Sequence, residues 1–238
     1  MAAQVVGVDG CMGGWVCVVL SVSETAAVLE QVQVWAHFEQ VLHAYNTAEA
    51  IAVDMPIGLW ESGRARMRPC DRVARAKLGK RACTVFIPPT REMLNATAYT
   101  SLRKLGLSVQ AYNLIPRIRE IDRLITPALQ AQVWESHPEL CFTGMVGTPI
   151  PYPKRAVQGH FARLHALRNA FGEGVYADLV ALLETLPQTY RRRQVRADDV
   201  LDAFALAWSA WRHWRGQSEV CLGEPSHDAR GLLMAIRY

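Results

Sequence analysis

The sequence predicts an α/β fold in which strands come first and helices follow. Short apolar runs rich in valine lie near the N-terminus, whereas apolar residues at helical spacing dominate the second half of the chain. Half of the 238 residues are hydrophobic and one fifth are charged, which is typical of a globular protein with a sizeable core. We find no internal repeat or linker and expect residues 1–238 to form a single domain.

The N-terminal quarter predicts the order β-β-β-α-β. Residues 4–9 read as a strand, and the short Cys-Met-Gly-Gly turn indicates an antiparallel hairpin with a second strand at 15–22. Residues 26–35 alternate as a third strand, and residues 36–45 have apolar side chains at helical spacing. The segment 50–59 repeats the opening pattern, with an apolar strand, an aspartate and a Pro/Gly exit.

A basic insertion is expected after the fourth strand. Residues 60–105 read as helix, loop and helix, and the stretch 60–81 alone carries eight basic and two acidic residues. The net charge of the whole chain is +4, so this one stretch accounts for all of the excess. The concentration indicates either an anionic partner or a solvated surface helix.

The rest of the chain predicts one more strand and several helices. Residues 131–140 read as a fifth strand that ends near Glu135 and is stopped by Pro138. Helices are expected at 111–125, 157–171, 175–186 and 196–214. The last of these is apolar nearly all round from Val200 to Trp211, which predicts a buried helix.

Composition bears on the compartment. The start of the chain has no basic segment of the signal-peptide type, and its longest apolar run is too short to cross a bilayer, so no membrane association is expected. The six cysteines form no C-x-x-C pair, which disfavours zinc sites and disulfide frameworks. A reduced, cytoplasmic setting fits best.

Acidic residues occur where the predicted elements converge. Asp9 ends the first strand, Asp54 ends the fourth and Glu135 lies near the end of the fifth. Asp199 and Asp202 lie in the first turns of the buried last helix; Asp199 could cap it, but capping does not explain Asp202. If the first, fourth and fifth strands are parallel neighbours, these carboxylates meet at one edge of the sheet, where ligand sites of open α/β sheets usually lie.

A cluster of carboxylates needs protons or cations, because two charges about 4 Å apart repel by about 4 kcal/mol at an effective dielectric constant near 20. Oxygen ligands favour Mg²⁺ or Mn²⁺ over zinc, and two such ions could activate water in phosphodiester hydrolysis. The expected metal ligands are Asp9, Asp54, Asp199 and Asp202.

Five stretches of the sequence, spread over almost the whole chain, share their order and spacing with one protein family. "VGVDGCMGGWVCV", "IAVDMPIGL", "KRACTVFIPPTR", "WESHPELCF" and "ADDVLDAFALA" resemble the family of predicted RNase H-like nucleases called domain of unknown function 429. The resemblance implies an RNase H-like fold with a five-stranded mixed sheet in the order 3-2-1-4-5 and helices on both faces. It also implies that Asp9, Asp54, Glu135 and either Asp199 or Asp202 are the metal-binding acids of a nuclease. Related resolvase-like enzymes often have Glu at the strand-four position, so Asp54 has a shorter reach.

Four other residues are candidates for binding a substrate phosphate. His137 could position water or phosphate, or hydrogen-bond the loop before Pro138. Thr84 and Arg91 could bind phosphate or hold the insertion in place, and Lys154 follows a rigid Pro-rich loop and could contact an anion.

Three functions remain open at this point. The first is a metal-dependent nuclease or phosphodiesterase with a nucleic-acid or nucleotide substrate. The second is a non-catalytic nucleic-acid or nucleotide binding protein on the same fold. The third, a phosphotransferase related to sugar kinases, is disfavoured because those proteins contain two such domains. The sequence fixes neither the substrate nor the oligomeric state.

Overall fold

The computed structural model of the chain describes residues 2–191 and 194–238 and contains a five-stranded mixed sheet. The strands lie in the order β3-β2-β1-β4-β5, which confirms the predicted α/β class and strand order. β1 pairs antiparallel with β2, and β2 with β3, whereas β1, β4 and β5 are parallel neighbours. Their bounds are β1 Ala3–Cys11, β2 Gly14–Val22, β3 Ala27–Trp35, β4 Ala50–Val53 and β5 Val133–Glu135.

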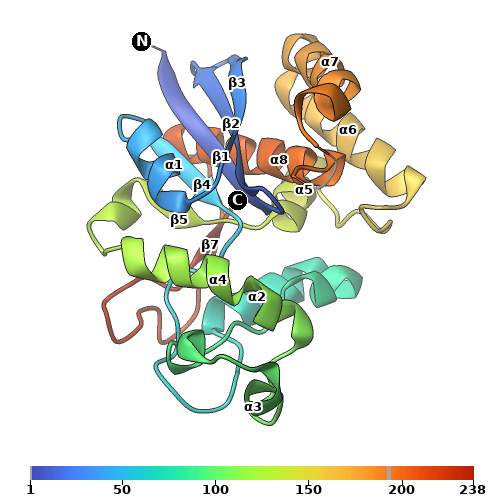
Figure 1. The fold of residues 1–238 in the computed structure, drawn as a ribbon. Coiled ribbons are helices and arrows are strands. Elements are labelled where there is room, and N and C mark those ends of the chain that lie inside the picture. Colours follow the sequence, from blue (N-terminus) through green and yellow to red (C-terminus); the bar gives the residue numbers. More distant parts are fainter. Residues whose placement is uncertain (1, 192–193) are drawn as a thin grey trace.

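Two layers of helices cover the sheet (Figure 1). On one face, α1 (Phe38–Ala44) and α4 (Val109–Leu124) share a buried apolar cluster with β1 and β4. On the other face lie α5 (Pro138–Val146), α6 (Val157–Phe171), α7 (Glu173–Thr189) and α8 (Ala197–Trp214). Burial on both faces explains why β1 and β2 are nearly continuous apolar runs.

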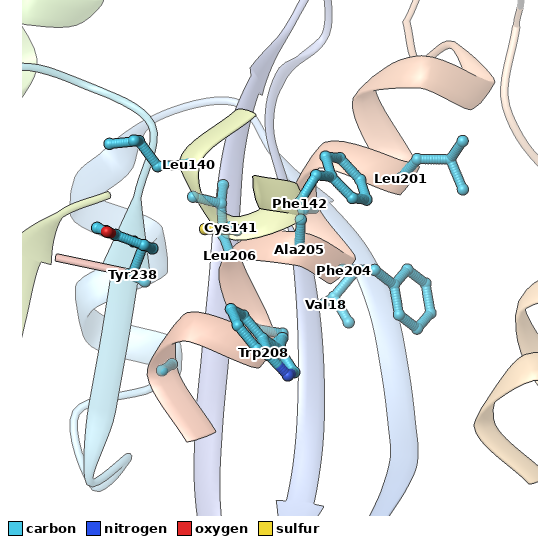
Figure 2. Close-up of a cluster of buried hydrophobic side chains, with 14 of the residues drawn as sticks. Val18, Leu140, Cys141, Phe142, Leu201, Phe204, Ala205, Leu206, Trp208 and Tyr238 are labelled. Carbon is cyan, nitrogen blue, oxygen red and sulfur yellow. The ribbon is translucent and has the colours of Figure 1, made fainter. Parts of the chain in front are cut away.

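The last helix, α8, is the centre of the second layer. Its residues from Val200 to Trp211 are all buried, as its composition predicted. Figure 2 shows side chains of α8, such as Phe204 and Trp208, in one cluster with Phe142 of α5 and Val18 of β2. The helix is therefore held by apolar contacts along its length rather than by its polar ends.

A glycine fixes where α8 crosses the sheet. A Cβ atom on Gly7 of β1 would overlap the backbone carbonyl of Ala203 and the backbone amide of Ala207. The two backbones approach this closely only because Gly7 has no side chain. The N-terminal turns of α8 consequently lie beside the C-terminal end of β1.

The insertion at residues 60–105 is more broken than the predicted helix, loop and helix. It contains α2 (Pro69–Leu78), the 3₁₀ turns η1 (Gly79–Thr84) and η2 (Glu92–Asn95), and the short helix α3 (Tyr99–Arg103). Several of its basic groups are bound within the protein. Arg68 is buried, Arg75 donates to the carbonyl of Val85 at 2.9 Å, and Lys77 pairs with Glu219 at 3.2 Å. The basic stretch is thus only in part a free surface.

Some elements were not predicted from the sequence. Pro138 does end the fifth strand, but it also begins α5, because proline suits the first turn of a helix. The chain also has a 3₁₀ turn, η3 (Leu129–Ala131), and a small antiparallel pair of β6 (Val220–Cys221) and β7 (Ile236–Arg237). In the part of the chain that the structure describes, no helix is both long and apolar enough to cross a membrane.

Candidate active site

Two of the predicted acids lie side by side at the C-terminal ends of parallel strands. The register pairs Gly7 with Ala52 and Val8 with Val53, so Asp9 and Asp54 follow at the same level on β1 and β4. Side chains alternate between the faces of a sheet, so both carboxylates are directed to the face of Gly7, which α8 covers. Asp9 is 6% exposed and Asp54 is half-buried.

Asp202 joins these two acids from α8. It lies one residue before Ala203, whose backbone touches Gly7, and only 4% of it is exposed. Asp202 and Asp54 are the charged neighbours that raise the pKa of Asp9 most. The structure thus brings together Asp9, Asp54 and Asp202, which we call the acid cluster.

Burial and mutual repulsion act on the whole cluster. Burial is the largest cause that raises the pKa of Asp9 well above its usual range, followed by the charges of Asp202 and Asp54. Burial likewise raises the pKa of Asp54 and brings that of Asp202 to about 6. The folded protein therefore favours protons or cations at this position.

Lys154 supplies one cation to the cluster. Its Nζ lies 2.5 Å from Oδ2 of Asp202 and 3.5 Å from Oδ2 of Asp198. Burial disfavours the ammonium group, but the neighbouring Asp202 and Asp9 raise the pKa of Lys154 nonetheless. This lysine, predicted to bind a substrate anion, contacts an acid of the protein in this structure.

Asp199 has a different position from Asp202. Its Oδ2 accepts the backbone N–H of Arg196 at 3.0 Å, so it caps α8. It also lines a separate hollow of about 240 Å³ together with Met12 and Arg117. Its charge still adds to the field that raises the pKa of Asp9. Asp199 therefore lies beside the acid cluster rather than within it.

Glu135 is not brought to the acid cluster. The register pairs Glu135 with Val53, one residue before Asp54, so its side chain is directed to the opposite face of the sheet. There it accepts two hydrogen bonds from Arg68, at 2.6 and 2.7 Å, and one from the backbone N–H of Ile57 at 2.8 Å. Arg68 also pairs with Asp71 at 2.6 Å. Glu135 thus belongs to a buried ion-pair network that ties the insertion to the sheet.

Glu139 lies close to the acid cluster, although the sequence analysis assigned it no role. Its charge helps to raise the pKa of Asp54 and of Asp202. Oε1 of Glu139 accepts hydrogen bonds from Arg163 at 2.5 Å and from Arg81 at 3.0 Å. A proline at the start of a helix places the next residue in its first turn, and this signal at Pro138 could have located Glu139.

A cleft of about 390 Å³ opens beside the acid cluster. Its walls include Asp54, Asp202, Lys154, His137, Thr84 and Arg81. Nδ1 of His137 is buried without a hydrogen-bond partner among the described residues, and Nε2 lies 3.4 Å from the carbonyl oxygen of Thr84. His137, Thr84 and Lys154 are therefore in position to meet a ligand in the cleft.

Arg91 lies outside the cleft and contacts carboxylates of other segments. Its guanidinium contacts Asp122 at 3.0 Å, Asp228 at 2.6 Å and Glu61. Asp122 belongs to α4 and Asp228 to the C-terminal segment, so Arg91 joins three distant parts of the chain. Arg91 is not among the described residues that line the cleft.

The donor set at the acid cluster fits Mg²⁺ or Mn²⁺ in kind. Asp9, Asp54 and Asp202 offer only carboxylate oxygens, and their raised pKa values show that positive charge is favoured there. Within residues 2–191 and 194–238, however, no three His, Cys, Asp or Glu side chains are arranged closely enough to hold an ion. The ammonium of Lys154 lies 2.5 Å from Oδ2 of Asp202, an oxygen that an ion would need.

Comparison with solved structures finds two structures of RuvC from Thermus thermophilus. The first, described as the Thermus thermophilus RuvC structure, is 16% identical, with a TM-score of 0.36 over 90% of this chain and 97% of that chain. The second, RuvC in complex with a Holliday junction substrate, is 14% identical, with a TM-score of 0.38 over the same shares. This likeness is too weak to assign a function.

Comparison with curated proteins finds no match. The family described as "Protein of unknown function (DUF429)" matches residues 7–227, which is nearly the whole chain and includes every member of the acid cluster. This match confirms the family resemblance that the sequence motifs indicated. The chain belongs to the DUF429 family.

Proposed function

We propose that this protein is a divalent-metal-dependent nuclease or phosphodiesterase of the RNase H-like type. The observation that carries the proposal is the meeting of the buried Asp9 and Asp202 with the half-buried Asp54 beside the cleft. If all three are ionised, the ammonium of Lys154 neutralises only part of their charge. Such an arrangement is costly to keep unless the charge serves a ligand.

The three carboxylates would hold Mg²⁺ or Mn²⁺, and Asp199 beside them would contribute to a second ion. A bound ion of this kind lowers the pKa of water and stabilises the charge that develops on a phosphodiester. The sheet fixes the backbone of Asp9 and Asp54, and the packing of α8 fixes that of Asp202. Side-chain movement alone would then bring the three carboxylates onto an ion.

The basic side chains of the cleft would receive the substrate phosphate. Lys154 would leave Asp202 for a phosphate oxygen when a metal ion takes its place. Arg81 is held against Glu139 at 3.0 Å, so Glu139 positions a guanidinium at the wall of the cleft. His137, which lines the cleft, would hydrogen-bond a phosphate oxygen or the attacking water.

A cleavage assay tests this proposal. Purified protein is incubated with Mg²⁺ or Mn²⁺ and a set of substrates that includes single-stranded DNA, duplex DNA, a four-way junction, RNA and bis-(p-nitrophenyl) phosphate. We expect cleavage of at least one substrate that EDTA abolishes and that Asp9→Asn lowers by about a hundredfold or more. Asp178→Asn, which removes an exposed acid of α7, is the matched control. If none of these substrates is cleaved in a metal-dependent manner, the proposal is contradicted.

The second candidate is a nucleic-acid or nucleotide binding protein without catalysis. It is favoured by the contact of Lys154 with Asp202, because a permanent lysine counter-charge would make a metal ion unnecessary. In that case the protein binds nucleic acid in a salt-dependent manner without turnover, and divalent ions leave its stability unchanged.

The assignment of residues 1–238 to one domain and the cytoplasmic setting stay predictions.

A further inference from the structure

A second hollow of about 380 Å³ adjoins the acid cleft. We call it the α6 groove, and its walls include Lys154, Arg155, Val157, His160, Phe161 and Asp198. It is formed by the first turns of α6, the loop before that helix and the start of α8. The proposed function makes no use of it.

Large apolar side chains are exposed in this groove. Val157 is 69% exposed and Phe161 is 56% exposed. They are four residues apart on α6 and so share one face of the helix. Leu164 and Leu167, further along α6, are buried in the hydrophobic core, whereas Val157 and Phe161 take no part in that core. The ring of Phe161 has no aromatic or cationic neighbour at stacking distance among residues 2–191 and 194–238.

The groove is continuous with the acid cleft through two basic residues. Lys154 and Arg155 line both hollows. Nζ of Lys154 reaches Asp202 at 2.5 Å on one side, while Arg155 has a side chain that is 74% exposed. A chain of phosphates that passes the acid cluster would therefore meet positive charge before it reaches Phe161.

We propose that the α6 groove binds an unpaired nucleobase of a single-stranded nucleic acid, with its ring stacked on Phe161. A base offers a flat face to the phenyl ring and Val157, and a polar edge to His160, whose ring can donate or accept a hydrogen bond. Lys154 and Arg155 then contact the adjoining phosphates. The choice of nucleic acid as the ligand rests on the proposed function.

The same geometry predicts discrimination against duplexes. Bases in a double helix are covered above and below by their neighbours, so their faces are not available to a side chain on the protein surface. Phe161 lies on the body of α6 rather than on a long loop, so it is unsuited to insert between stacked bases. Single strands, or unpaired parts of branched substrates, are the expected ligands.

The test measures binding of a fluorescent 12-nucleotide single strand by anisotropy, in EDTA and at low salt. Phe161→Ala is expected to weaken binding about five- to one-hundred-fold, and Phe161→Trp to restore it. A strand of the same length without bases is expected to bind wild type and Phe161→Ala equally. Val28→Ala, at an exposed apolar position on β3, is the control and is expected to change nothing.

Three results would overturn the inference. The first is equal binding of the normal strand by wild type and Phe161→Ala. The second is an equal loss on the strand without bases, which would mean that Phe161 acts through the fold of the groove and not through stacking on a base. The third is a dimer of the wild type that Phe161→Ala converts to a monomer in sedimentation, which would assign the groove to a second copy of the chain.

Failure of the inference is distinguishable from failure of the proposed function. Phe161 lines the α6 groove and not the acid cleft. Phe161→Ala is therefore expected to keep the stabilisation by Mn²⁺ that we expect from the acid cluster. If Phe161-dependent binding is found and no metal response, the nuclease proposal fails and the groove stands. If the metal response and cleavage are found and Phe161 has no effect on binding, only the groove inference fails.

Discussion

Replacement of Asp202 by asparagine removes a buried charge that the folded protein tolerates poorly. Burial raises the pKa of Asp202 to about 6 from an ordinary value of 3.8, and this value already includes the attraction of Lys154. Each tenfold change in proton affinity corresponds to about 1.4 kcal/mol, so the ionised carboxylate lowers the free energy of unfolding by about 3 kcal/mol at pH 8. Asparagine has nearly the same shape and no charge. Asp202→Asn is therefore expected to be more stable than wild type at pH 8, by up to about 3 kcal/mol.

The size of the effect changes with pH in a defined way. Between about pH 4 and pH 6 the folded protein binds more protons at Asp202 than the unfolded chain does, so the stability of the wild type falls as the pH rises. The advantage of Asp202→Asn is expected to be full at pH 8 and to vanish near pH 4. Urea unfolding in EDTA at pH 4, 6 and 8 measures it.

Asp228 provides a control of opposite sign. Burial opposes its charge, but hydrogen bonds from Arg91 at 2.6 Å and from backbone amides hold the pKa of Asp228 below its usual range. Its charge stabilises the folded protein above about pH 4, so Asp228→Asn is expected to lose stability at pH 8. If Asp202→Asn is less stable than wild type at pH 8, the description of the acid cluster as electrostatically strained is refuted.

Three other substitutions test separate parts of the account. Lys154→Met is expected to lower the free energy of unfolding in urea by about 1 kcal/mol at pH 8 and to leave it unchanged at pH 4, because the acid cluster loses its counter-charge. The effect is small because the lysine side chain is partly exposed. Glu135→Gln is expected to keep the thermal response to Mn²⁺, because Glu135 pairs with Arg68 away from the acid cluster; loss of that response would return Glu135 to the metal site. Gly7→Ala is expected to lower the free energy of unfolding by about 3 kcal/mol in calorimetry and to lose the Mn²⁺ response, because the added methyl group displaces α8. The control Gly174→Ala on α7, where a Cβ has no described atom within 4 Å, is expected to change neither.

The acids of the cluster could be predicted because each signal is local. A carboxylate directly after an apolar strand identified Asp9 and Asp54, and an aspartate inside an apolar helix identified Asp202. The parallel pairing of β1 with β4 then brings the first two together without any further information. The order of the strands followed from the family resemblance rather than from the patterns alone.

The position of Glu135 could not be predicted in the same way. β5 has only three residues, and a shift of one residue in its register moves a side chain to the other face of the sheet. Nothing in so short a strand fixes the register. Arg91 shows a related limit, because its partners Asp122 and Asp228 lie 31 and 137 residues away in the sequence. Long-range ion pairs of this kind have no local signal.

Glu139 and Arg163 show a third limit. The sequence predicts only that Pro138 stops the fifth strand, whereas Pro138 also begins α5, and Glu139 in its first turn lines the cleft. Arg163 is a charged residue in the middle of α6, and its burial at 1% exposure depends on Glu139 as its partner. The pair could be located only once the two helices are placed together.

The most direct test of the central claim is a titration of Mn²⁺ and Mg²⁺ into metal-free wild type, Asp9→Asn and the exposed-acid control Asp178→Asn, followed by thermal unfolding. The account predicts that wild type and Asp178→Asn gain stability by about 2.7 kcal/mol at a hundredfold excess of ion over Kd, and that Asp9→Asn gains little. It also predicts that metal-free Asp9→Asn is at least as stable as metal-free wild type, because burial and repulsion raise the pKa of Asp9. Equal responses of wild type and Asp9→Asn, or no response of either, would contradict the claim that Asp9, Asp54 and Asp202 form a metal site.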